Sequence, residues 1–217
     1  MTIETLLKVV PPHPRPFEAF AGPWKVMEDW LGSALPQDYK DFVRIYGSGS
    51  FLQFMGIFIP HTANRYTRLE NQIGMVCRSF AELAAESPHP FWPEPGGLVP
   101  LGVTDNGDHL FWLPMGATPE DWRVVVWDRG GLDLDAFEEF DCDLTDFLAG
   151  LATGEITPRA FPDDLLPCEH PFIPGSEFPD VPEGPDVAKG TGATSDPAAS
   201  PSLKWRTRFA WPGRIGW

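Results

Sequence analysis

The chain has 217 residues and a formal net charge of −15 at pH 7, so it offers no general cationic surface for the phosphates of a nucleic acid. It contains no apolar run of the roughly 18 residues that a transmembrane helix needs, and its three widely spaced cysteines indicate neither a disulfide framework nor a zinc site. Apolar residues make up 42% of the chain, enough to bury a sizeable core.

The opening stretch, MTIETLLKVVPPHPRPF, lacks the basic region, apolar core and small-residue cleavage site of a secretory signal. Its prolines indicate an N-terminal extension over residues 1–19, ahead of a main domain that we expect over residues 20–157. The isolated cysteines fit a reducing compartment. A cytoplasmic protein is therefore expected.

Two helices are predicted next. Residues 24–31 place apolar side chains at helical spacing and are followed by Gly32, a plausible stop. The second helix begins at Pro36, whose missing N–H costs little in the first turn. It ends at Gly47, which can take the left-handed conformation of a C-cap.

The middle of the chain alternates apolar segments with turns. Residues 51–60 are rich in aromatic and branched side chains and predict one buried strand. Residues 63–87 predict a longer helix. Within residues 98–114, two apolar runs flank an Asn-Gly dipeptide at 106–107, the strongest short-range indication of a β-hairpin.

The last elements of the domain are two strands and a helix. Residues 122–128 and 134–142 predict the strands, and residues 143–156 predict the helix, with Asp143 as its N-cap. Adjacent strands joined by short turns indicate an antiparallel sheet, so the expected class is α+β, a single domain of sheet and packed helices. The proline-rich residues 158–174 are expected to pack on it.

The composition changes at residue 175. Residues 175–202 are mostly Gly, Pro, Ser, Ala and Asp, which cannot bury enough apolar surface to fold, so a disordered linker is predicted. The final stretch, LKWRTRFAWPGRIGW, mixes basic and aromatic residues without an acid. Such a tail could contact RNA, a membrane surface or the protein's own acidic body, or have no role. Residues 175–217 hold five acidic and five basic residues, so the net charge belongs to residues 1–174.

No motif of a common catalytic centre is present. The GxSxG nucleophile elbow, the phosphate loop and the GxGxxG fingerprint are all missing. The histidines lack the spacing of a helical metal site, although His61 and His109 could converge in space. The turn around Asp105 and Asp108 lacks the other ligands of a calcium loop. We therefore expect a protein that is not an enzyme and that binds no cofactor or metal.

One acidic cluster stands out near the end of the domain. Its carboxylates could be a general acid and base, a patch for a basic partner, or solvated turns leading into a helix N-terminus that favours negative charge. A catalytic role would require the groups to converge in a substrate-sized pocket with shifted pKa values. The cluster comprises Asp133, Asp135, Glu138, Glu139, Asp141, Asp143 and Asp146.

Three motifs, taken together and in this order, resemble the SUKH superfamily. They are LPQDYKDFVRIYGSGSF, LVPLGVTDNGDHLFWLP, and WRVVVWDRGG followed by FDCDLTDFLAGLATG, and the match covers about residues 20–155. The residues that carry the first two motifs are Leu35, Pro36, Tyr39, Phe42, Tyr46, Gly47, Gly49, Pro100, Gly102, Thr104, Gly107, Asp108, Phe111 and Trp112.

The resemblance implies a scaffold without catalytic residues. Bacterial members are commonly immunity proteins that bind a toxin domain, often a nuclease or deaminase, and fungal relatives are scaffolds in cell-wall signalling. It therefore implies a protein-binding module whose partner is a toxin domain. Nuclease toxins are usually basic because they must hold phosphates, so a basic partner is expected. The net charge of −15 argues against direct contact with nucleic acid. A scaffold or regulator without a toxin partner is the alternative. The oligomeric state does not follow from the sequence.

We predict that the contact surface combines carboxylates and tryptophans, the usual anchors of interfaces. Because alternate residues of a strand face opposite sides of a sheet, some of these tryptophans are expected in the core. The predicted contact residues are Trp112, Trp122, Trp127, Asp133, Asp135, Glu138, Glu139, Asp141 and Asp143.

Overall fold

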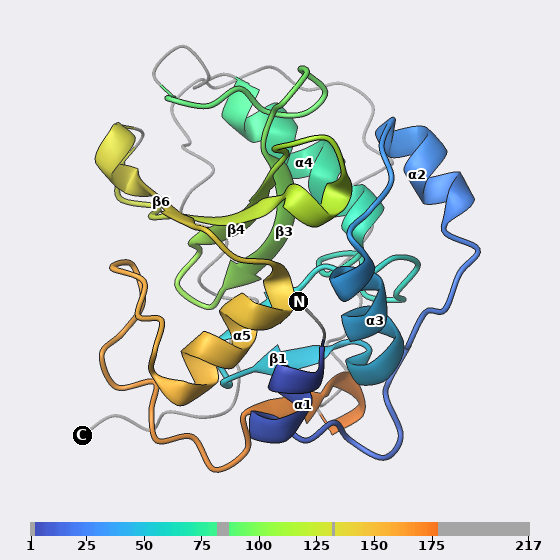
Figure 1. Cartoon of the computed structure of the whole chain (residues 1–217), viewed down its shortest axis with the longest axis vertical. Helices are drawn as coiled ribbons and strands as arrows, with labels where there is room; N and C mark the ends of the chain where they lie inside the picture. The colour runs from blue at the N-terminus through green and yellow to red at the C-terminus, as the bar shows by residue number, and fades with distance from the viewer. Residues whose placement is uncertain (1–2, 82–86, 132, 178–217) are drawn as a thin grey trace, which may run out of the picture. The chain divides into compact units, whose positions relative to one another are not determined.

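The computed structural model describes residues 3–81, 87–131 and 133–177. The predicted linker and tail, residues 175–217, therefore lie outside the described residues except for 175–177, which form a short 3-10 turn rather than disordered chain. A seven-stranded sheet in the order β6-β5-β4-β3-β2-β1-β7 forms the centre (Figure 1). Every strand pair is antiparallel, which confirms the α+β class. The strands are β1 Gly49–Phe51, β2 Met55–Ile57, β3 Val99–Thr104, β4 His109–Leu113, β5 Arg123–Trp127, β6 Phe137–Phe140 and β7 Phe172–Pro174.

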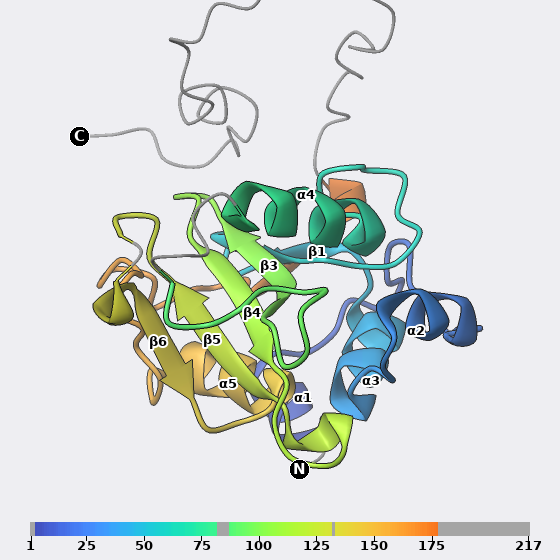
Figure 2. The same cartoon turned by 90° about the horizontal axis from the view of Figure 1, so that it is seen from above.

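Helices cover both faces of the sheet. Helix α4 lies on one side, and α1, α3 and α5 lie on the other (Figure 2). The helices are α1 Glu4–Val9, α2 Lys25–Leu31, α3 Gln37–Tyr46, α4 Leu69–Ala81 and α5 Leu144–Thr153, with short 3-10 turns η1 Pro119–Asp121, η2 Leu134–Ala136 and η3 Gly175–Glu177.

The alternation of side chains along β4 divides the core into two parts. Leu110 and Trp112 join the larger cluster, which includes residues of α3 and α5. Phe111 and Leu113 join a smaller cluster with Phe80 of α4. The side-chain period of two in a strand therefore explains why β4 is apolar at consecutive positions: both of its faces are buried.

Two predicted elements, the strand over residues 51–60 and the helix over residues 63–87, differ from the structure. The segment 51–60 is not one strand but the end of one and the whole of another, because Leu52 and Gln53 turn the chain with φ of 51° and 52°. No Asn or Gly marks this turn; burial of Leu52 holds it. The predicted helix 63–87 begins only at Leu69, and residues 82–86 lie outside the described part.

Three local predictions are confirmed. Helix α3 follows Pro36 and is capped by Gly47, although Gly47 has φ of 67° and ψ of −158° and not the left-handed helical conformation that was predicted. The Asn-Gly hairpin joins β3 to β4, and Gly107 has a φ of 93°. Helix α5 is capped by Asp143, whose side chain accepts a hydrogen bond from the Asp146 backbone N–H. Each of these has its cause within a few residues of sequence.

Two further elements were not predicted. Helix α1 packs against α5 and buries Leu6 completely. Strand β7 pairs with β1 in the register Ser50↔Ile173 and becomes one edge of the sheet. Both are short, with six and three residues, so periodicity alone could not distinguish them from loops.

Candidate protein-binding face

The acidic residues of the predicted contact cluster are distributed over three places. Asp133 and Asp135 belong to the turn at η2, where Asp133 accepts a hydrogen bond from the Ala136 N–H. Glu138 and Glu139 lie on β6, the sheet edge opposite β7. The remaining carboxylates, Asp141, Asp143 and Asp146, follow in the connection to α5 and its first turn.

The two glutamates of β6 already have partners within the fold. Glu138 Oε2 accepts a hydrogen bond of 2.8 Å from the backbone N–H of Arg159. Glu139 Oε1 lies 3.4 Å from His89 Nε2. Because of its hydrogen bond to Arg159, Glu138 has a structural role as well as a charge.

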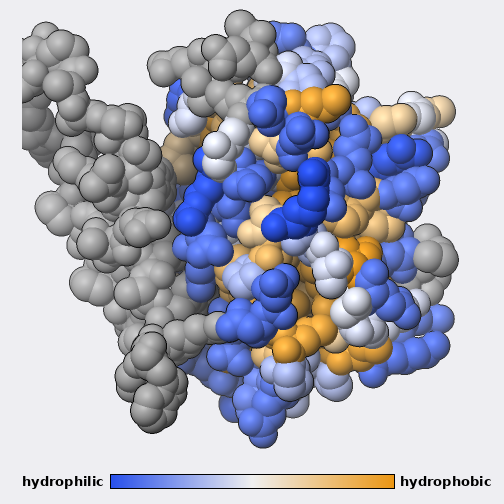
Figure 3. All heavy atoms as spheres, turned by 90° about the vertical axis from the view of Figure 1, so that its left-hand side faces the viewer, coloured by the Kyte–Doolittle hydropathy of each residue, from blue (hydrophilic) through white to orange (hydrophobic). Residues whose placement is uncertain are grey.

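Figure 3 looks onto the side of the molecule that carries β6 and shows hydrophilic residues around smaller hydrophobic areas.

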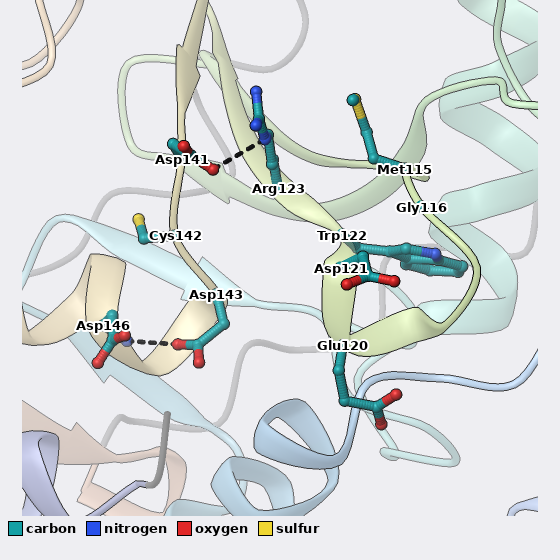
Figure 4. Close-up of a pocket in the computed structure, with 10 residues that line it drawn as sticks. All are labelled: Met115, Gly116, Glu120, Asp121, Trp122, Arg123, Asp141, Cys142, Asp143 and Asp146. Atoms are coloured by element: carbon teal, nitrogen blue, oxygen red, sulfur yellow. Dashed lines mark hydrogen bonds and ion pairs between the residues drawn. The ribbon is translucent and has the colours of Figure 1, made fainter.

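The third group lines a cleft of about 500 Å³. One wall is the connection from β6 to α5, and the other is the segment leading through η1 into β5 (Figure 4). The second wall brings in Glu120 and Asp121, which the sequence analysis did not select. Thr118 and Asp121 form a capping box at η1, a pattern that the sequence contains but that does not reveal which surface it joins. The lining residues are Met115, Gly116, Glu120, Asp121, Trp122, Arg123, Asp141, Cys142, Asp143 and Asp146.

Five carboxylates and one guanidinium line this cleft, so its charge is negative. Arg123 Nε lies 2.9 Å from Asp141 Oδ1 (Figure 4). Hydrogen bonds from the backbone and side chain of Thr118 and from the Ala117 N–H hold the pKa of Asp121 below its usual value. Burial, and then the charge of Asp143, raise the pKa of Asp146.

The cysteine in the cleft is not poised to act as a nucleophile. Burial raises the pKa of Cys142 to about 12, and the neighbouring charges of Asp143, Asp146 and Asp141 act in the same direction. The thiolate is the reactive form of cysteine. At neutral pH this side chain is therefore a protonated thiol.

Two carboxylates meet at the N-terminus of α5. Asp143 Oδ1 accepts from the Asp146 N–H at 2.8 Å and from the Thr145 hydroxyl at 3.1 Å. Asp38, at the start of α3, accepts from the Thr145 N–H at 3.1 Å. Burial and the charge of Asp143 raise the pKa of Asp38 to about 6. The hydrogen bond between Thr145 and Asp38 joins α5 to α3 across 107 residues of sequence.

The predicted tryptophans occupy different environments. Trp112 is 1% exposed and packs edge-on against Tyr39 with ring centroids 4.8 Å apart, so it belongs to the core. Trp122 is also buried but lines the cleft. Trp127 is half-buried, and its indole N–H donates to the Gly131 carbonyl at 2.7 Å. The most exposed tryptophan of the described chain is Trp30 of α2, at 45%, which sequence analysis had placed on an apolar helix face.

The two histidines considered for a joint site have different neighbours. His61 Nδ1 lies 2.7 Å from Glu70 Oε1, and its ring contacts Phe20. His109 contacts Phe80 and Trp127, and burial lowers its pKa to about 4. Within the described residues no group of three or more His, Cys, Asp or Glu side chains could hold a metal ion. No helix there is long and apolar enough to cross a membrane.

The residues of the first sequence motif build the scaffold. Tyr39 donates its hydroxyl hydrogen to the Phe58 carbonyl at 2.7 Å, and Tyr46 donates to the Val10 carbonyl at 2.6 Å. Both rings are completely buried. A family model, SUKH_6, with the description SMI1-KNR4 cell-wall, matches residues 23–148, more than half of the chain.

The chain belongs to the SUKH family.

The SUKH match begins just before α2 and ends within α5, so it includes α3, the Asn-Gly hairpin and both walls of the acidic cleft. Comparison of the chain with curated proteins and with solved structures found no match. The match confirms the resemblance that the three motifs indicated. The two motif tyrosines have a structural role in this chain. The buried hydroxyl of Tyr39 connects α3 to the segment after β2, and that of Tyr46 connects α3 to Val10 at the end of α1.

Proposed function

We propose that this SUKH protein is a non-enzymatic immunity protein that binds and neutralises a basic toxin domain. The observation that carries the proposal is the carboxylate-lined cleft on a SUKH scaffold. Toxins that cleave or modify nucleic acids need cationic surfaces to hold phosphates. Carboxylates of the cleft would take the place of phosphate oxygens and cover such a surface.

The electrostatic argument extends beyond the cleft. Opposite net charges accelerate the encounter of two proteins, and an acidic face suppresses binding to other acidic proteins. Exposed carboxylates continue from the cleft to β6 and the η2 turn, where Asp141, Glu139 and Asp135 are exposed. A partner covering this face would contact most of the predicted acidic residues.

A second candidate is an intracellular scaffold or regulator with the same fold and no toxin partner. The description of the matched family, SMI1-KNR4 cell-wall, favours it. The two candidates differ in the partner rather than in the kind of activity, since both act by binding protein. Identification of the partner therefore separates them.

The test is a pull-down with the full chain from its native host, identified by mass spectrometry at low and at high salt. We expect one basic toxin domain whose recovery falls as salt rises, because salt screens exposed charges. Recovery of cell-envelope or signalling proteins instead would support the regulator. Recovery of a toxin that is insensitive to salt would contradict the electrostatic basis of the proposal.

Charge reversal tests the assignment of the face. The triple variant Glu120→Lys, Glu139→Lys and Asp141→Lys changes three exposed side chains, and we expect it to weaken toxin binding at least about tenfold, or about 1.4 kcal/mol. The measurement is the Kd by calorimetry or interferometry. A matched control, Glu4→Lys, Glu155→Lys and Glu169→Lys, alters the net charge equally at exposed positions outside the cleft and β6. Equal weakening by both triples would show that only net charge matters and would remove the site assignment.

A further inference from the structure

A second cleft lies against the acidic one. Its volume is about 520 Å³, and the two clefts share Met115, Gly116 and Trp122. The second cleft is lined by prolines and tryptophans between the end of α2, the loop at residues 92–97 and the loop that precedes η1. We call it the tryptophan groove; its principal side chains are Leu31, Trp92, Pro93, Pro95, Pro114, Met115, Pro119 and Trp122.

The walls of the tryptophan groove are held in place before any ligand binds. The indole N–H of Trp92 donates to the Leu31 carbonyl at 2.9 Å. Trp30 packs on Trp92 with ring centroids 4.9 Å apart. Trp122 packs against Trp112 of the core at 6.0 Å. Rigid aromatic walls lower the entropic cost of binding because few rotamers are lost.

Large apolar side chains stay exposed at this groove. Met115 is 40% exposed and lines it, and Trp30 is 45% exposed while its ring contacts that of the lining residue Trp92. The described chain has six exposed large hydrophobic residues, and two of them lie at or against this one groove. Such a concentration is typical of a contact surface.

The backbone of the groove offers few hydrogen-bond donors. The four lining prolines have no N–H. The backbone N–H groups of Gly32, Trp92, Glu94, Gly97, Ala117, Thr118 and Trp122 all donate within the fold. An extended strand binds by exchanging a row of backbone hydrogen bonds, and most residues of this wall either have no N–H or already donate it within the fold. The groove therefore suits a ligand that docks by its side chains and keeps its own backbone solvated.

A polyproline II segment meets this requirement. It has no internal hydrogen bonds, its backbone is solvated, and it docks in aromatic-lined grooves through proline and other apolar side chains. We propose that the tryptophan groove binds a proline-containing basic segment of the partner protein in the polyproline II conformation, with an Arg or Lys placed in the adjoining acidic cleft. The proposal rests on the proposed function only in taking the partner to be a basic protein.

The junction of the two clefts sets the direction of the segment. Glu120 and Asp121 lie in the acidic cleft, immediately beside the shared residue Trp122. Both are exposed. A guanidinium next to the proline core would reach these carboxylates, and a bidentate Arg–carboxylate pair adds orientation to the apolar contact. Charge complementarity therefore places the basic end of the segment on the η1 side.

The test uses the full chain labelled with ¹⁵N, whose tryptophan indole resonances are assigned by single Trp→Phe substitutions. The probe is a capped synthetic peptide of sequence RRPLPPLP. We expect saturable shifts of the Trp30, Trp92 and Trp122 indole resonances. Replacing both arginines of the peptide by glutamate should weaken its binding at least about tenfold, since two favourable charge contacts become repulsive.

Variants at exposed positions keep the fold intact while changing the groove. Trp30→Ala and Met115→Ser are each expected to raise the peptide Kd at least about fivefold through loss of apolar contact. Val9→Ala, at an exposed apolar side chain on α1, is the matched control and should leave the Kd unchanged. Binding that is indifferent to Trp30→Ala and Met115→Ser would overturn the proposal.

Each competing occupant gives a different result without peptide. If the groove resonances move with protein concentration alone, a second copy of the chain is the occupant. If they move when Trp205 and Trp211 of the full chain are replaced by Ser, its own C-terminal segment is the occupant. Either result, or no shift at millimolar peptide, overturns the proposal. None of them alters the toxin pull-down, so failure here is distinguishable from failure of the proposed function.

Discussion

Gly47→Ala is expected to destabilise the protein by about 3 kcal/mol or more, because two costs coincide at this residue. Its φ of 67° and ψ of −158° lie in a region that is essentially restricted to glycine. A Cβ there would also lie 2.2 Å from the Phe17 carbonyl oxygen. That oxygen accepts the Ser48 N–H at 2.7 Å, so it cannot move away without losing a hydrogen bond.

The matched control is Gly32→Ala, at the C-cap of α2. Gly32 also has a positive φ, in the left-handed helical region with φ of 80° and ψ of 10°, but a Cβ there would meet nothing within 4 Å. We expect this variant to lose only about 1 kcal/mol, the conformational cost alone. The measurement is the free energy of unfolding in urea for both variants. Similar losses would mean that close packing at Gly47 contributes nothing.

The second large effect is the pH dependence of the free energy of unfolding, to which His109 contributes. Burial lowers its folded-state pKa from 6.5 to about 4. Between these values the unfolded chain binds a proton that the folded chain does not, so stability falls as the pH is lowered from 6.5 to 4. A shift of this size corresponds to about 3 kcal/mol.

Asp38 acts over nearly the same range with the opposite sign. Its folded-state pKa is raised from 3.8 to about 6 by burial and by Asp143. Between these values the folded chain binds a proton that the unfolded chain does not, so stability falls as the pH rises from 3.8 to 6. The size is again about 3 kcal/mol. In the native protein the two contributions largely cancel.

Single substitutions are expected to reveal the two opposing pH dependences of stability, one from Asp38 and one from His109. In His109→Phe, Asp38 remains, and stability should decline by about 3 kcal/mol between pH 4 and 6 relative to the double variant. In Asp38→Asn, His109 remains, and stability should increase by a similar amount over pH 4 to 6.5. The double variant with both substitutions supplies the background of the other carboxylates. Free energies from urea denaturation at four or more pH values provide the test, and parallel curves for the two single variants would refute it.

The parts of the fold that could be predicted are those with a local cause. Helix α3 has Pro36 and Gly47 at its ends, α5 has Asp143 at its start, and the Asn-Gly hairpin contains its own turn. The turn at Leu52 was missed because a buried leucine, rather than glycine or asparagine, adopts the positive φ. There tertiary packing overrides the local preference.

The candidate site was less predictable than the fold for a related reason. The acidic stretch from Asp133 to Asp146 is continuous in sequence, but its side chains divide among a turn, a strand and a helix N-terminus. The opposite wall of the cleft comes from Glu120 and Asp121, and the tryptophan groove adds the loop around Trp92. Such juxtapositions follow from strand order, which no short motif contains.

Strand β7 and helix α1 bear on where the boundaries of this domain should be drawn. Sequence similarity to the SUKH family ends at residue 148 and begins at residue 23. Yet the buried Tyr46 hydroxyl finds its acceptor at Val10, and the outer edge of β1 is covered by Ile173 and its neighbours. Without those flanks a buried phenol would lack a partner and β1 would present an open edge, the kind of surface through which sheets aggregate. We therefore expect the cooperative folding unit to extend beyond the region of family similarity and to include both flanking elements.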